Sequence, residues 1–83
     1  MSIAAEIREF IIEQFLFGVG GDDLSDDDSL LEKGIVNSTG VLEVLGFLED
    51  SYGVETEDDE LIPDNLDSIS KLAAFVDRKK AAG

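Results

Sequence analysis

The sequence predicts an all-α fold, a small four-helix bundle with three main helices, one short helix and a long first loop. Two observations favour it. Apolar residues recur three and four positions apart in three separate segments, the spacing that gathers side chains on one face of a helix, and patterns typical of strands are weak throughout. The chain has 83 residues, so we expect residues 1–83 to form one small domain with a limited core.

The first helix is predicted from about Ser2 to Phe17. Its inward stripe consists of Ile3, Ile7, Phe10, Ile11 and Phe15. The residues expected to end it are Gly18, Gly20 and Gly21.

A long loop, residues 18–37, follows this helix. Loops of such length are uncommon in compact domains unless they are functional or anchored. The apolar residues expected to anchor it in the core are Leu24, Leu30, Leu31, Ile35 and Val36. The loop also holds an acidic run, made up of Asp22, Asp23, Asp26, Asp27 and Asp28. The run lacks the glycine and distal glutamate of a calcium-binding loop, so we expect loosely held cations and no metal site.

The second main helix carries the clearest signals. Ser38 is predicted to be its N-cap, and Gly53 follows its last residue, Tyr52. The inward stripe consists of Val41, Val44, Leu45, Leu48 and Tyr52. The opposite face carries Thr39, Glu43, Gly46, Phe47 and Asp50, with Leu42 and Glu49 on its shoulder. This acidic face is either a docking surface or a plain solvated face.

A short helical turn is predicted around Pro63, with Leu61, Ile62 and Leu66 against the core. Asp67 is predicted to cap the last helix. The residues that this helix would bury are Ile69, Leu72, Ala73 and Val76. Its C-terminal end is basic, with Arg78, Lys79 and Lys80, which complements the helix dipole.

The charge balance points to basic protein partners. The chain has 20 acidic residues against six basic ones, for a formal net charge of −14, and no Lys or Arg occurs between Gly34 and Ser70. Binding to nucleic acid or to an anionic membrane needs clusters of basic residues that this sequence lacks. A basic protein surface would be attracted over a long range at low salt.

The residue types also exclude several kinds of chemistry. The absence of Cys and His rules out disulfides, thiolate nucleophiles, Cys/His zinc sites and histidine acid–base catalysis. Ser29 and Ser38 have no histidine base to activate them, and a bundle of this size offers little room for a closed site, so we do not expect an enzyme. No apolar segment approaches the ~18 residues of a membrane span, and no signal peptide opens the chain. We therefore expect a cytoplasmic protein.

The order of these elements resembles the acyl carrier proteins over nearly the whole chain. That family is a four-helix bundle with an attachment serine at the start of an acidic second helix. The most specific likeness is the stretch GIVNSTGVLEVLGFLEDSYGVE, and LDSISKLAAFVDRK is similar to the family's last helix. The family's signature is Asp-Ser-Leu, and its one literal match is Asp28-Ser29-Leu30.

We nevertheless choose Ser38 over Ser29 as the attachment site, for a physical reason. Ser38 begins a predicted helix whose acidic face partners can bind. The helical segment after Ser29 ends within one turn and has no docking face. A phosphodiester on Ser38 would also meet unpaired backbone N–H groups and the positive end of the helix dipole. Asn37 stands where the family has Asp, and Thr39 where it has Leu or Met. Both changes lie at positions that the modifying transferase would contact when it recognises the protein.

The resemblance implies a monomeric acyl carrier protein that serves fatty acid biosynthesis or a dedicated product of lipid metabolism. Acyl intermediates would be carried as thioesters on a 4′-phosphopantetheine arm, which a phosphopantetheinyl transferase moves from coenzyme A to Ser38. The family's partner-docking positions correspond to Thr39, Leu42, Glu43, Gly46, Glu49 and Asp50. These residues would meet basic surfaces on the acyl-loading and acyl-processing enzymes.

The core itself could shelter an acyl chain between the helices. The residues expected to line such a shelter are Ile7, Phe10, Ile11, Val41, Leu45, Leu48, Tyr52, Ile69, Leu72 and Val76. Two alternative functions stay open. An aminoacyl or peptidyl carrier would share the architecture and the arm, whereas a non-covalent acidic adaptor would share the fold and need no serine.

Overall fold

The computed structural model describes residues 2–18 and 24–82. Its longer helices are α1 (Ile3–Phe15), α2 (Ser38–Tyr52) and α4 (Ile69–Ala82). A four-residue helix, α3 (Pro63–Leu66), and a single 3₁₀ turn, η2 (Asp58–Glu60), lie between α2 and α4. No strand occurs in either described range. The predicted all-α fold, with three main helices and one short helix, is therefore confirmed.

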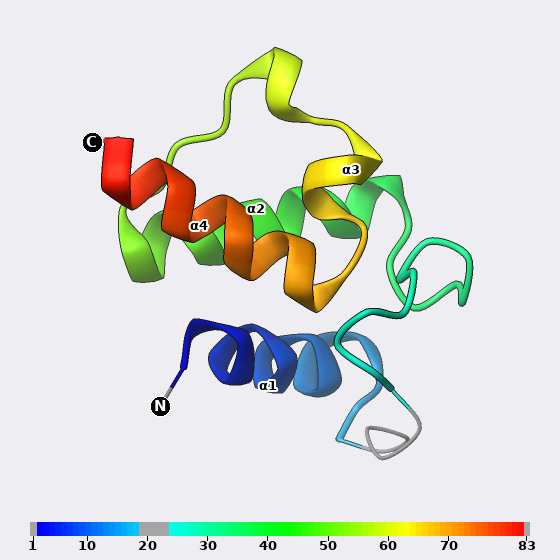
Figure 1. The fold of residues 1–83 in the computed structure, drawn as a ribbon. Helices are drawn as coiled ribbons and strands as arrows, with labels where there is room; N and C mark the ends of the chain where they lie inside the picture. The colour runs from blue at the N-terminus through cyan, green and yellow to red at the C-terminus, as the bar shows by residue number, and fades with distance from the viewer. Residues whose placement is uncertain (1, 19–23, 83) are drawn as a thin grey trace.

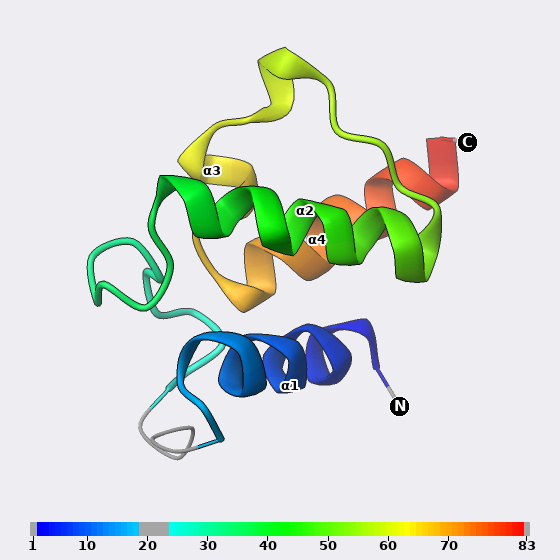
Figure 2. The ribbon, with the colours of Figure 1, turned by 180° about the vertical axis from the view of Figure 1, so that it is seen from behind.

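The helices pack with α4 as the common partner (Figure 1). α1 runs in the opposite direction to α2 and α4, and it packs against α4, as does α3. The first loop joins α1 to α2 at one end of the bundle (Figure 2). The segment that holds η2 and α3 arches over the side of α2 and α4 that faces away from α1 (Figures 1 and 2). Ser38, at the start of α2, consequently lies at the end where the first loop and α3 meet.

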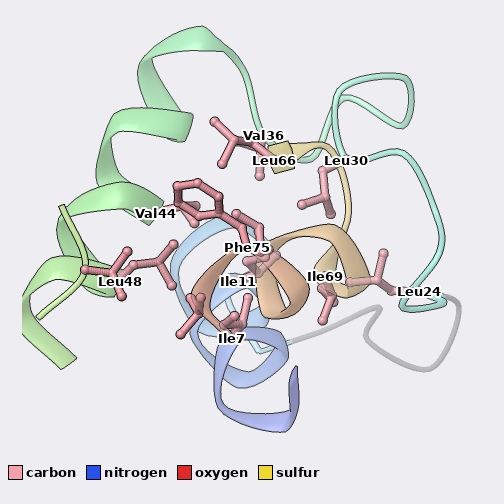
Figure 3. Packing of buried hydrophobic residues seen from close by; sticks show 13 residues of the cluster. Ile7, Ile11, Leu24, Leu30, Val36, Val44, Leu48, Leu66, Ile69 and Phe75 are labelled. Atoms are coloured by element: carbon pink, nitrogen blue, oxygen red, sulfur yellow. The ribbon is translucent and has the colours of Figure 1, made fainter. Parts of the chain in front are cut away.

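The core forms where the loop and all the helices converge. Its buried apolar residues are Ile7, Ile11, Leu24, Leu30, Val36, Val44, Leu48, Val54, Leu66, Ile69, Leu72, Phe75 and Val76. Phe75 lies in the middle of this cluster (Figure 3) and is 1% exposed. The helical stripe predicted for α4 did not include it. α4 is covered by α1 on one side and by α3 on another, so its buried face is wider than a single stripe.

The end of α1 departs slightly from its prediction. The helix stops at Phe15, two residues before the predicted Phe17. Phe17 takes a left-handed conformation with φ 54°, and the N–H of Gly18 then donates to the carbonyl of Ile12 at 3.0 Å. Gly18 thus takes part in ending the helix, while Gly20 and Gly21 lie outside the described residues.

The predicted cap of the last helix was wrong by one residue. α4 begins at Ile69, so the hydroxyl of Ser68 is the side chain that caps it, accepting from the N–H of Lys71 at 3.0 Å. The carboxylate of Asp67 turns to the first loop instead. It accepts from the Ser29 hydroxyl at 2.5 Å and from the N–H of Leu31 at 2.9 Å. These bonds fasten the loop to the junction of α3 and α4.

Three leucine and isoleucine side chains expected in the core are partly exposed. Leu31, Leu61 and Ile62 are 40%, 42% and 44% exposed, so this part of the prediction was wrong. Leu24, Leu30 and Val36 are buried and do anchor the loop, as predicted. The exposed three instead line a groove at the surface, beside the start of α2.

Candidate functional site

Ser38 is the first residue of α2, and its side chain is exposed. The predicted N-cap role of Ser38 was wrong, because Asn37 takes it. The side-chain oxygen of Asn37 accepts from the N–H of Gly40 at 2.7 Å. Both residue types are good caps, and Asn37 is the one with the extended backbone that the N-cap position requires. The Ser38 hydroxyl therefore makes no hydrogen bond to the rest of the described chain.

An apolar groove opens beside this hydroxyl. It holds about 260 Å³ and is lined by Leu31, Ser38, Val41, Leu42, Leu61, Ile62, Pro63, Leu66 and Asp67. Its walls come from the first loop, α2, the segment before α3, and α3 itself. Of the residues expected to shelter a chain inside the bundle, Val41 lines this groove, and Ile7, Ile11, Leu48, Ile69, Leu72 and Val76 are closed core.

Ser29 has a different surrounding. Its hydroxyl donates to Asp67 at 2.5 Å and accepts from the N–H of Glu32 at 3.1 Å. The side chain is half-buried, and both bonds hold the turn that follows it. The serine in the literal Asp-Ser-Leu match thus has a local structural role that ties the loop to Asp67.

The six residues of the predicted docking face are all exposed along α2. They are Thr39, Leu42, Glu43, Gly46, Glu49 and Asp50. Leu42 is 63% exposed, which makes it an apolar contact point among acidic neighbours. Leu42, Gly46 and Glu49 also line a groove against the segment that carries Val54 and Thr56.

Phe47 was expected on this exposed face, and that expectation was wrong. Its ring is half-buried and stacks on Phe10 of α1, with centroids 4.2 Å apart and an interplanar angle of 18°. A helical wheel places Phe47 away from the inward stripe, but α1 covers that flank of α2. The stack joins the two helices.

The carboxylates of α2 have no ion-pair partner in the described ranges. The three ion pairs seen there are Arg8–Asp26, Lys33–Asp28 and Lys79–Glu60. The bond from Lys79 holds the pKa of Glu60 below its usual value, and the N–H of Ser25 does the same for the pKa of Asp28. These three basic side chains pair with carboxylates outside α2, so the acidic face of α2 keeps its negative charge.

Metal sites and membrane-spanning helices are both absent from the described residues. Residues 2–18 and 24–82 contain no cluster of acidic side chains arranged to hold a metal ion. Asp22 and Asp23 of the predicted acidic run lie outside these ranges. No helix among the described residues combines the length and apolar character needed to cross a membrane.

Among the comparisons with known proteins, those with solved structures find similar folds. No family model matches the sequence, and no curated protein matches it significantly. Among solved structures, the holo acyl carrier protein of Nitrosomonas europaea, solved by NMR, superposes with a TM-score of 0.78. The match covers 98% of this chain and 99% of that one at 23% identity. This chain has the acyl carrier protein fold.

A second solved structure carries a different description. A chain from the crystal structure of an FAD-dependent dehydrogenase is 31% identical and has a TM-score of 0.75. The match covers 84% of this chain and 97% of that one, so the likeness spans nearly all of a chain shorter than this one. The carrier fold described above has only helices in its described ranges and lacks the mostly parallel sheet of a dinucleotide-binding domain. What the two chains share over the matched length is therefore a helical fold.

Proposed function

We propose that this chain is an acyl carrier protein, a single carrier domain over residues 1–83 that holds a 4′-phosphopantetheine arm on Ser38. One observation carries the proposal. A serine hydroxyl that makes no hydrogen bond to residues 2–18 or 24–82 stands at the N-terminus of an acidic helix and opens onto an apolar groove. The chain supplies the attachment point, the groove and the docking face, and separate enzymes carry out the chemistry.

The residues around Ser38 fit a phosphodiester. The side-chain oxygen of Asn37 accepts from the N–H of Gly40, and the backbone carbonyl of Asn37 accepts from the N–H of Val41 at 2.9 Å. The N–H groups of Ser38 and Thr39 make no bond to the described chain, so they can face a phosphate oxygen. The positive end of the α2 dipole lies at the same place. The arm supplies a thiol, which this cysteine-free chain does not contain.

The groove favours an acyl cargo over an aminoacyl one. Its walls are leucine, isoleucine, valine and proline side chains, and Asp67 is the acidic residue that lines it. Both carboxylate oxygens of Asp67 already accept hydrogen bonds, from Ser29 and Leu31. A free ammonium group would lose water and meet a single carboxylate that already accepts two hydrogen bonds, whereas an alkyl chain would bury apolar surface.

This preference can be measured by NMR on the loaded protein. An octanoyl arm should shift the resonances of Val41, Leu42 and Ile62, and an alanyl arm should shift only the residues next to Ser38. Equal effects of the two arms on the groove would favour an aminoacyl or peptidyl carrier.

The partners we propose follow from the charge of α2. Thr39, Leu42, Glu43, Gly46, Glu49 and Asp50 would contact basic surfaces on a phosphopantetheinyl transferase and on the enzymes that load and process acyl groups. Charges would set the encounter rate, and Leu42 would supply apolar contact. Such a carrier would work as a monomer in the cytoplasm, where coenzyme A and these enzymes act.

The second solved structure suggests one partner class. That structure is of an FAD-dependent dehydrogenase, although the matched chain is smaller than this one. We therefore include a flavin-dependent dehydrogenase acting on carrier-bound thioesters among the candidate partners. Reduction of its flavin by an acylated form of this chain, and not by the same acyl group on coenzyme A, would support the pairing.

The central test is the intact mass after incubation with coenzyme A, magnesium and a broad-specificity phosphopantetheinyl transferase. Wild type and Ser29→Ala should each gain one phosphopantetheine unit, and Ser38→Ala should gain none. Because the Ser29 hydroxyl holds the loop, circular dichroism should first confirm that Ser29→Ala is folded. A folded wild type that gains no mass would favour the non-covalent adaptor.

A further inference from the structure

A second concave site lies between α1 and α2, away from Ser38. It holds about 440 Å³ and is lined by Glu6, Glu9, Phe10, Glu13, Phe47, Ser51 and Tyr52. Phe47 comes nine residues after Ser38, which places it about 14 Å further along the helix. None of the residues that line this cleft belongs to the groove beside Ser38.

The cleft has an aromatic floor. Phe10 and Phe47 stack at 4.2 Å, and the Tyr52 ring meets Phe47 edge-on with centroids 6.1 Å apart. The Tyr52 hydroxyl donates to a Glu6 carboxylate oxygen at 2.7 Å, which fixes both side chains at one end. Together these three rings make the floor of the cleft apolar.

The rim of the cleft is acidic. Glu6, Glu9 and Glu13 lie three and four residues apart, so they follow one face of α1. Like charges at this spacing destabilise a helix. The three ion pairs in the described ranges join other residues, and no Lys or Arg is among the described residues that line the cleft. A cation from outside would relieve this repulsion.

We propose that the cleft is a second docking site, which takes an arginine side chain from a basic segment of a partner protein. A guanidinium group is planar and weakly hydrated, so it can rest on the aromatic floor while its fork of donors reaches two carboxylates. Its aliphatic stem would cover the ring edges. The chain's own Lys80 Nζ, 5.8 Å from the Tyr52 ring centroid, already places a cation against the neighbouring end of this surface.

This site is independent of the arm on Ser38. A partner that grips the cleft would leave the groove and the start of α2 accessible. Ser38→Ala should therefore bind the same basic segment with unchanged affinity, so failure of the carrier assignment and failure of this proposal would be seen in different experiments.

The test is a titration followed by two-dimensional NMR, with a blocked pentapeptide, acetyl-Gly-Gly-Arg-Gly-Gly-amide, as the probe. Two further peptides carry lysine or the neutral analogue citrulline in place of arginine. The arginine peptide should shift the amides of Phe10, Phe47 and Ser51 most. The citrulline peptide should have no effect, and the lysine peptide should bind several-fold more weakly.

Two double variants of equal charge distinguish binding at this cleft from non-specific attraction to the negative charge of the protein. Glu9→Gln with Glu13→Gln should weaken the arginine peptide about fivefold. Asp58→Asn with Asp64→Asn removes the same charge from exposed positions on the segment that arches over the side facing away from α1, and should change the affinity less than about twofold. Equal losses in both variants, shifts spread along α2, or equal binding of the lysine peptide would overturn the proposal.

Discussion

Two glycines of α2 allow the packing near Ser38 to be tested quantitatively. Gly40 is buried, and a Cβ added there would lie 2.9 Å from Phe15 Cε1 and 3.2 Å from Val36 Cγ1. Gly46 is exposed, and a Cβ there would meet nothing within 4 Å. Alanine should gain about 1 kcal/mol of helix propensity at either position. At Gly40 this gain must compete with the displacement of the Phe15 ring and of the buried Val36.

The two substitutions should therefore have opposite effects. Gly46→Ala should raise the free energy of unfolding by about 1 kcal/mol. Overpacking costs about 1–3 kcal/mol, so Gly40→Ala should lower it by about 1 kcal/mol after the propensity gain. For a domain of this size, a difference of about 2 kcal/mol between the variants corresponds to roughly 8–16 °C in melting temperature.

Urea unfolding followed by circular dichroism would measure both variants, at one fixed ionic strength because the net charge is −14. Equal stabilisation by the two alanines would contradict the expected clash at Gly40. It would mean that Phe15 and Val36 move aside freely, so that the close packing at Gly40 does not constrain the start of α2.

Four further predictions concern the site and its surroundings. Asn37→Ala should lose about 1 kcal/mol of stability because it removes the side-chain cap of α2. Asn37→Asp should keep the fold and be modified faster by a broad-specificity transferase. Equal modification rates for wild type and Asn37→Asp would count against recognition of this position by the transferase. Glu43→Lys should slow transfer by partner enzymes at low salt and leave the circular dichroism spectrum unchanged; unaltered kinetics would argue against the docking face. Magnesium should raise the melting temperature by screening acidic repulsion, and a melting temperature indifferent to it would contradict this. Burial and the bond to Glu6 raise the pKa of Tyr52 to about 12. The stability that its neutral phenol adds is therefore present below about pH 10 and lost between pH 10 and 12. A Tyr52→Phe variant should lose less stability than wild type over that window, and parallel curves of stability against pH would contradict this contribution of Tyr52.

Local patterns predicted the helices well because a helix is stabilised by residues close together in sequence. The apolar spacing correctly predicted that Val44 and Leu48 of α2 are buried. Gly53 ends that helix with φ 68°, as expected. Errors at helix starts were single-residue errors. Asn37 and Ser38 are both capping types, and so are Asp67 and Ser68, so composition alone does not decide between neighbours.

Features made by distant segments were not predictable in this way. Phe47 lies off the inward stripe of α2, and only the approach of Phe10 from α1 buries it. The groove at Ser38 is formed jointly by the first loop, α2 and α3. The Asp67 carboxylate fixes the loop there by accepting a hydrogen bond from the N–H of Leu31. Ser29, the literal match to the family signature, is engaged by the same carboxylate, which no sequence pattern indicated.

The most direct measurement is the position of the modification on the wild-type chain. The protein would be incubated with octanoyl-coenzyme A, magnesium and the transferase, and fragmented in a mass spectrometer. We expect one octanoyl-phosphopantetheine unit, on fragments that contain Ser38 and not on those that contain Ser29 alone. Addition at Ser29, or no addition to the folded chain, would contradict it.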